Sequence, residues 1–387
     1  MTTVPPIRLP AGVRDFLPVS AARRRQLAEN VMSVFELFGY ARVITPMFEV
    51  DDVLGRGTST RETAIRFVEP GSGEIVTLRP DITPQIARIV ATRLADVPGP
   101  IRLCYEGAVT RLAHAGQREI LQAGIELIDA SDAGDAEVLS VAIAVLERLG
   151  LKPHLDLGHV APARYVLDGA PNIDALIAAI ARKDRAGVRV AARELSTEKQ
   201  HLAQELVHLW GPYDKALARA RALPWPDHVH AAFAQIEHTI AQLEGASITI
   251  DFGEVRGFDY YTGMRFAAYA DNAPEAILRG GRYDELIGRY GRPARATGFA
   301  IDLEAIAKAL PQVPARPLGV ATNDRALAKQ LRSAGVRCIV QEDCSPEWLR
   351  GAGLDAAVIG DRIYFANDRE AAVTPGDIPS LIALLKA

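Results

Sequence analysis

The stretch Glu254-Val255-Arg256-Gly257-Phe258-Asp259-Tyr260-Tyr261 carries the most information about the fold of this chain. A second stretch, Arg279-Gly280-Gly281-Arg282-Tyr283-Asp284, follows it closely. Each combines arginine, carboxylate and tyrosine hydroxyl groups in a strand-like context. The planar guanidinium of Arg256 suits a carboxylate, which it can bind through two parallel bonds. Tyr260 and Tyr261 point to opposite faces of an extended segment, so only one lines a pocket with Arg256 unless the strand bulges.

An upstream segment, Thr77-Leu78-Arg79-Pro80-Asp81-Ile82-Thr83, ends a strand and begins a helix over residues 84–94. Asp81 offers a carboxylate to an ammonium group, and Thr83 adds a second acceptor. The alternative is that Asp81 only caps the helix. Taken alone, the segment favours this capping role.

Two further strands are expected at residues 101–111 and 118–128, joined by a short loop. Gln122 and Glu126 lie on one face of the second strand, because side chains alternate along a strand. A glutamate buried beside a glutamine is costly without a donor or cation to pair with it, and an imidazole is a suitable partner. The alternative is a half-exposed strand whose polar side chains face water.

The periodicity of apolar residues predicts an α+β fold. A first helix is expected over residues 21–38 and a strand over residues 40–44, and Pro70-Gly71-Ser72-Gly73 indicates a hairpin. A helix follows over residues 135–149. Residues 161–245 are Ala-rich and helical, as an insertion into a mainly antiparallel sheet. The expected domains are residues 1–316 and a small α/β module over residues 317–387.

Composition narrows the class of protein further. The chain has 387 residues, enough for two or three domains, and a net charge of −4, which gives no bulk attraction to nucleic acid. Cys104, Cys338 and Cys344 lack metal-ligand spacing, so neither a metal nor a cofactor is expected. The start of the chain lacks the apolar core of a signal peptide, and no apolar run is long enough for a membrane. We therefore expect a cytoplasmic protein with no nucleic-acid or membrane partner.

In their order and spacing, these segments resemble the class II aminoacyl-tRNA synthetase core, and specifically the catalytic domain of histidyl-tRNA synthetase. The resemblance covers about residues 8–310, from Leu9-Pro10-Ala11-Gly12-Val13-Arg14-Asp15 through Gly39 to Pro46 and on to Ala296-Thr297-Gly298-Phe299-Ala300-Ile301. It implies an antiparallel sheet flanked by helices and a pocket for L-histidine. The residues that it implicates are Asp81, Thr83 and Gln122 for the ammonium group, Arg111 and Arg256 for the carboxylate, and Glu126 and Tyr261 for the imidazole, with Tyr260 beside them.

The ATP-binding half departs from the family pattern. Ala113 stands where a synthetase has a carboxylate, and the loop at residues 113–117 is shortened. Asp302 and Ala305 replace a glycine and the arginine that neutralises phosphate charge. Each lost charge-assisted bond is worth roughly 1.5–3 kcal/mol, and an added carboxylate repels the nucleotide. The sequence therefore predicts that the chain does not form an adenylate.

A retained histidine site beside a lost ATP site resembles the pattern of the regulatory subunits of ATP phosphoribosyltransferase. The resemblance implies a non-catalytic chain that activates the short-form catalytic subunit, with L-histidine as its inhibitory ligand. It further implies a homodimer, formed through residues 39–46, within a larger hetero-oligomer. The alternatives are a divergent histidyl-tRNA synthetase and a stand-alone amino-acid-binding or tRNA-interacting paralogue.

Overall fold

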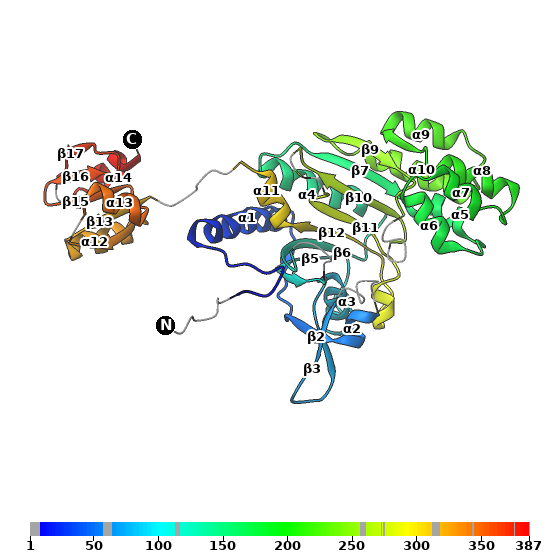
Figure 1. Cartoon of the computed structure of the whole chain (residues 1–387), viewed down its shortest axis with the longest axis horizontal. Coiled ribbons are helices and arrows are strands. Elements are labelled where there is room, and N and C mark those ends of the chain that lie inside the picture. Colours follow the sequence, from blue (N-terminus) through cyan, green and yellow to red (C-terminus); the bar gives the residue numbers. More distant parts are fainter. Residues whose placement is uncertain are drawn as a thin grey trace, which may run out of the picture. The chain divides into compact units, whose positions relative to one another are not determined.

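The computed structural model describes residues 8–56, 64–112, 117–255, 261–271, 273, 275–311, 318–342, 344–374 and 376–386. The chain folds into two compact units, Met1–Gln312 and Val313–Ala387. Figure 1 shows the elements of both units.

A nine-stranded sheet forms the centre of the first unit (Figure 1). Two strand pairs, β1–β5 and β7–β9, are parallel, and the other pairs among the described residues are antiparallel. The predicted α+β, mainly antiparallel fold is thus confirmed. In spatial order the strands are β1 (Ala41–Arg42), β5 (Ile101–Thr110), β6 (Glu119–Ile128), β12 (Ala296–Asp302), β11 (Leu278–Arg282), β10 (Met264–Tyr269), β7 (His154–His159), β9 (Ser247–Asp251) and β8 (Trp210–Pro212).

Three helices cover one face of this sheet and bury its main core: α1 (Pro18–Leu37), α4 (Gly134–Arg148) and α11 (Leu303–Ala309). Phe35 of α1 meets Phe299 of β12 edge to face, with ring centroids 5.8 Å apart. Helix α1 begins three residues earlier than residue 21, because proline is tolerated in a first helical turn, where its missing N–H has no helical partner. The strand expected over residues 40–44 is confined to Ala41–Arg42.

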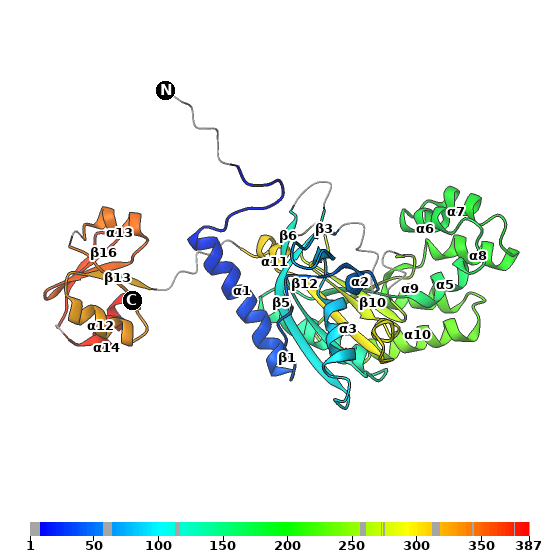
Figure 2. The ribbon, with the colours of Figure 1, turned by 90° about the horizontal axis from the view of Figure 1, so that it is seen from below.

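The opposite face of the sheet carries α2 (Asp51–Gly55), α3 (Thr83–Thr92) and the 3₁₀ turn η2 (Ile287–Tyr290). Figure 2 shows β5 lying between α1 and α3. A three-stranded sheet, β2-β4-β3, adjoins α2. Its strands are β2 (Phe48–Val50), β3 (Ile65–Val68) and β4 (Ile75–Leu78), and the last two form the hairpin predicted around Pro70-Gly71-Ser72-Gly73.

The helical insertion lies at the β7–β9 end of the large sheet (Figures 1 and 2). Side chains of Asn172, Asp184 and Ser196 accept bonds from backbone N–H groups and so begin α6, α7 and α8. These caps explain why the Ala-rich stretch forms several short helices. They are α5 (Val160–Leu167), α6 (Ile173–Ala181), α7 (Arg185–Ala191), α8 (Thr197–Leu206), α9 (Tyr213–Arg221) and α10 (Asp227–Ile240).

The second unit is a small α/β fold with its own core. Its sheet order is β14-β13-β15-β16-β17, with β13 parallel to both of its neighbours. Helix α13 and strand β17 were not predicted. The elements are β13 (Gly319–Thr322), α12 (Arg325–Ser333), β14 (Arg337–Val340), α13 (Pro346–Ala352), β15 (Ala356–Ile359), β16 (Arg362–Phe365), β17 (Glu370–Ala372) and α14 (Ile378–Lys386).

Candidate functional site

The floor of the candidate site is the face of β6 and β12 that points away from Phe299 and the main core. Gln122 and Glu126 lie on this face, paired across the ladder with Asp302 and Gly298. A methyl group at Gly298 would overlap the Glu126 carboxylate and the carbonyl oxygen of Ile125. Glycine is therefore needed there for the two strands and the carboxylate to approach each other.

A cavity of about 200 Å³ opens above this floor. Six of the eight residues predicted for the histidine pocket line it: Asp81, Thr83, Arg111, Gln122, Glu126 and Tyr261. The other two, Arg256 and Tyr260, lie outside the described residues. Glu254, Val255 and Tyr261 lie between β9 and β10 and not in a strand, so the expected strand-like context is wrong for these three residues. The rest of the segment, residues 256–260, lies outside the described residues.

Glu126 is held by hydroxyl groups from three parts of the chain. Thr83 donates to its carboxylate at 2.7 Å, Tyr105 at 3.4 Å, and Tyr283 donates to its other oxygen. Burial raises the pKa of Glu126 well above its ordinary value of 4.5, although the Thr83 bond opposes the shift and the charge of Asp81 adds to it. The burial of this glutamate predicts a ligand that pairs with it, whereas protein hydroxyls already contact it. Thr83, expected at the ammonium group, is engaged with Glu126.

This buried carboxyl makes stability depend on pH. Above pH 4.5 the unfolded chain has released a proton that folded Glu126 keeps, so unfolding releases a proton. The free energy of unfolding should then fall as pH rises, by at most about 1.4 kcal/mol per pH unit, until Glu126 ionises in the folded chain. Glu126→Gln removes this dependence. We expect the unfolding free energy of the variant, relative to wild type, to rise between about pH 6 and about pH 8 in urea titrations. A difference that does not change with pH would contradict the assignment.

Two acceptors near Glu126 are suited to a donor ligand. The Gln122 side chain is buried, and its Oε1 has no hydrogen-bond partner among the described residues. Asp81 lies just before α3, where its Oδ1 accepts from the Ile82 backbone N–H at 2.8 Å, and it lines the same cavity. A buried acceptor without a donor is unfavourable, so a bound ammonium group would be stabilising here.

Two arginines, Arg111 and Arg279, also line the cavity. Arg111 donates through Nε to the carbonyl oxygen of Pro80 at 2.8 Å, which fixes the guanidinium beside the Asp81 segment. Arg279 donates to the carbonyl oxygen of Ala276 at 3.2 Å. Arg279 and the glutamate-bound Tyr283 were not chosen as site residues from sequence, although both belong to the second quoted stretch.

The end of the cavity at β12 is acidic. Asp302 lines the cavity and caps α11, where its carboxylate accepts from the N–H groups of Glu304 and Ala305 at 2.9 Å each. These are the amide groups that would otherwise face an anion at the start of the helix. The repulsion of a nucleotide by Asp302 remains a prediction. Ala113 lies outside the described residues.

No described group of His, Cys, Asp and Glu side chains has the arrangement needed for a metal ion. None of the described helices combines the length and apolar character that crossing a bilayer requires.

The fold and the cavity together define a class II aminoacyl-tRNA synthetase-like protein of the histidyl type. The family model for histidyl-tRNA synthetase matches residues 12–306. A histidyl-tRNA synthetase from Nostoc sp. superposes with a TM-score of 0.81 at 19% identity, over 99% of both chains, which supports the fold alone.

Closer relatives narrow the family. The ATP phosphoribosyltransferase regulatory subunit of Anaeromyxobacter dehalogenans is 45% identical over 332 residues, which cover 81% of this chain and 94% of that protein. The subunit of the same name from Geobacter sulfurreducens is 39% identical, over 81% of this chain and 76% of its own length. A Bacillus halodurans structure is described as an ATP phosphoribosyltransferase regulatory subunit/histidyl-tRNA synthetase. It superposes with a TM-score of 0.82 at 28% identity, over 93% of this chain and 100% of that chain. The chain belongs to the family of ATP phosphoribosyltransferase regulatory subunits.

Proposed function

We propose that this chain is the non-catalytic regulatory subunit of a cytoplasmic ATP phosphoribosyltransferase in histidine biosynthesis. It activates the short-form catalytic subunit and mediates feedback inhibition when L-histidine fills the cavity above β6 and β12. The observation that carries this proposal is one cavity in which polar groups suited to a small amino acid lie beside an acidic helix start. Gln122 and Glu126 form a polar floor for a small amino acid, while Asp302 occupies the helix start where a nucleotide would need positive charge.

The cavity suits each part of L-histidine. Asp81 and Gln122 accept hydrogen bonds from the ammonium group. The bond to Gln122 Oε1 stabilises the complex most, because this buried oxygen has no hydrogen-bond partner among the described residues. Glu126 accepts from the imidazole N–H, and the Tyr261 ring lies beside it. A cationic donor favours the ionised carboxylate and thus opposes the effect of burial on the pKa of Glu126. Thr83 acts through Glu126, whose orientation it fixes.

The histidine carboxylate is assigned to Arg111, which lines the cavity, together with Arg256. Two guanidinium groups bind a carboxylate more strongly than one, because each adds its own charge-assisted bonds. Such bonds are roughly twice as strong as neutral ones. The role of Arg256 and that of Tyr260 remain predictions from the family pattern. Regulation further requires that histidine bind one conformation of the hetero-oligomer better than another.

We also propose a homodimer that involves β1 and the neighbouring small sheet. Leu37 and Ile44, on either side of β1, are 85% and 80% exposed, and Phe48 and Phe67 of the small sheet are 49% and 41% exposed. Phe48 and Phe67 pack edge to face, with ring centroids 6.0 Å apart, and grouped exposed apolar side chains mark protein interfaces. Sedimentation of the isolated chain tests this: a monomer at micromolar concentration would contradict it.

Calorimetry of L-histidine and of ATP with the isolated chain tests the proposed function. We expect histidine to bind and ATP to show no binding. The same chain should restore activity to the short-form catalytic subunit, and histidine should inhibit the complex. Histidine-dependent exchange of pyrophosphate into ATP would instead support a divergent histidyl-tRNA synthetase, because only that enzyme forms an adenylate.

A further inference from the structure

Residues 261–263 pass between the large sheet and the helical insertion, and both sides hold them by hydrogen bonds. On the sheet side, the Thr262 N–H donates to the Arg282 carbonyl oxygen at 2.7 Å, and the Asp284 N–H donates to the Thr262 hydroxyl at 2.8 Å. On the other side, Arg164 donates to the Tyr261 carbonyl oxygen at 2.7 Å. The segment that carries a cavity tyrosine is therefore shared between two parts of the fold.

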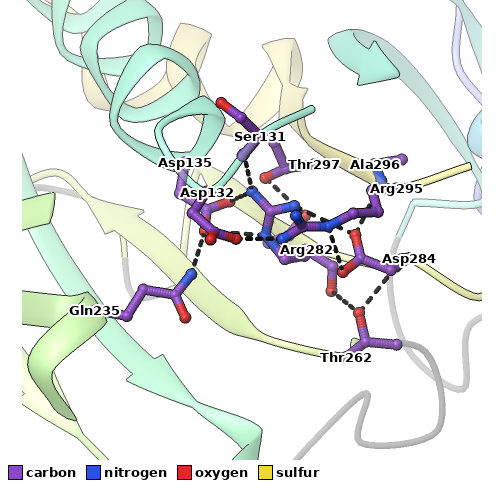
Figure 3. A network of polar contacts seen from close by, with 11 residues as sticks. Ser131, Asp132, Asp135, Gln235, Thr262, Arg282, Asp284, Arg295, Ala296 and Thr297 are labelled. Atoms are coloured by element: carbon purple, nitrogen blue, oxygen red, sulfur yellow. Dashed lines mark hydrogen bonds and ion pairs between the residues drawn. The ribbon is translucent and has the colours of Figure 1, made fainter. Parts of the chain in front are cut away.

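The sheet side of this segment is bound to a buried polar network. Arg282 is 3% exposed and forms an ion pair with Asp135 of α4, which is 1% exposed. The same guanidinium donates to the Ser131 carbonyl oxygen at 2.8 Å and to Asp284 at 3.3 Å, so that Arg282 lies at the centre of the network in Figure 3. Breaking a buried pair of this kind leaves an uncompensated charge. Movement of the segment toward the sheet is correspondingly unfavourable.

The contacts on the insertion side come from one face of a single short helix. Val160, the first residue of α5, donates its N–H to the Gly263 carbonyl oxygen at 3.1 Å, and Arg164 stands one turn later on the same face. Arg164 is only half-buried. Helix α5 in turn packs against α8 and α10 of the insertion. A displacement of residues 261–263 is therefore passed first to α5.

The Tyr261 ring connects the cavity to this segment. It lines the candidate histidine cavity and a second cavity of about 400 Å³ on the β10 side. A methyl group at Gly281 would lie 2.7 Å from the ring, so the ring rests directly on the sheet backbone. The ring cannot move farther into the sheet, but it borders open space toward β10. Filling the first cavity thus acts on Tyr261 and, through its carbonyl group, on Arg164.

We propose that Arg164 couples occupancy of the cavity to the helical insertion, so that the insertion transmits the histidine signal to the partner subunit. The proposal rests on the proposed function and adds the route of regulation. Arg164 is a positioning residue, because it acts through its bond to the carbonyl oxygen of Tyr261. Coupling between two sites requires an element with two arrangements, and the insertion is the candidate element.

The test compares the full-length chain with Arg164→Met, which removes the donor, and Arg164→Lys, which keeps one. Calorimetry measures histidine affinity, assays of the assembled hetero-oligomer measure inhibition, and hydrogen exchange follows residues 160–240 with and without histidine. For Arg164→Met we expect histidine affinity within about threefold of wild type, about tenfold weaker inhibition, and loss of the exchange response in the insertion. Arg164→Lys should recover part of the coupling.

Arg189→Met is the matched control, since Arg189 is an exposed arginine on α7 of the same insertion. It should leave affinity, inhibition and the exchange response unchanged. If Arg164→Met retained wild-type inhibition and the wild-type exchange response, the coupling proposal would be overturned while the proposed function stood. Failure of the unmodified chain to bind histidine would overturn both.

Discussion

Glu126→Gln should weaken L-histidine binding by about 10- to 150-fold, which corresponds to roughly 1.5–3 kcal/mol. Glutamine keeps the size of the side chain and an acceptor for the Thr83 hydroxyl. It cannot ionise, so it cannot form the charge-assisted bond that the proposed function assigns to Glu126 and the imidazole when histidine is bound. Calorimetric titration with histidine at neutral pH measures the effect.

Glu119→Gln provides the control for this measurement. Glu119 begins the same strand and is half-exposed, so its loss of charge should leave histidine affinity within about twofold of wild type, as for a surface charge. If Glu126→Gln also bound histidine within about twofold, the carboxylate would not contact the ligand. The assignment of the imidazole to Glu126 would then be wrong.

Gly298→Ala should destabilise the first unit by about 3 kcal/mol and abolish histidine binding. The added methyl group overlaps Glu126 Oε2 and the Ile125 carbonyl oxygen. The second of these is backbone in the middle of a nine-stranded sheet, so it has little freedom to move. Urea unfolding and calorimetry measure the two effects separately.

Gly351→Ala is the matched glycine substitution. Gly351 lies in α13 of the second unit. Apart from its chain neighbours and the backbone of its own helix, no atom lies within 4 Å of the added methyl group. Alanine is favoured over glycine inside a helix by roughly 0.5–1 kcal/mol, so this variant should be neutral or slightly more stable. Equal stability of Gly298→Ala and wild type would show that β12 can move away from Glu126.

The floor of the site was predictable because it depends on short-range geometry. Gln122 and Glu126 are four residues apart, and the alternation of side chains along a strand places them on one face whatever the rest of the fold does. The hairpin of β3 and β4 was predictable for a similar reason, since Pro70-Gly71-Ser72-Gly73 specifies the turn locally.

The partners of Glu126 were not predictable in the same way. Thr83, Tyr105 and Tyr283 come from α3, β5 and the segment after β11, and only the packed sheet brings their hydroxyl groups together. No local pattern records which hydroxyl donates to which carboxylate. This is why the bonds of Thr83 and Tyr283 to Glu126 were not predicted.

Local sequence patterns also did not predict the short elements of the insertion and the second unit. Strand β8 has three residues and contains glycine and proline, which are unfavourable in a strand, yet it pairs with β9 at the edge of the large sheet. Helix α13 has seven residues and is set by the Ser345 side chain, which accepts from the Trp348 N–H.

The carboxylate of Asp302 also bears on how easily such a chain could acquire adenylate chemistry. An arginine introduced at Ala305 would stand at the third position of α11, from which a side chain reaches back to the capping residue. It would pair with Asp302 instead of remaining available to a triphosphate. Under the proposed function, an arginine at position 305 would therefore gain nothing for nucleotide binding unless Asp302 changed with it.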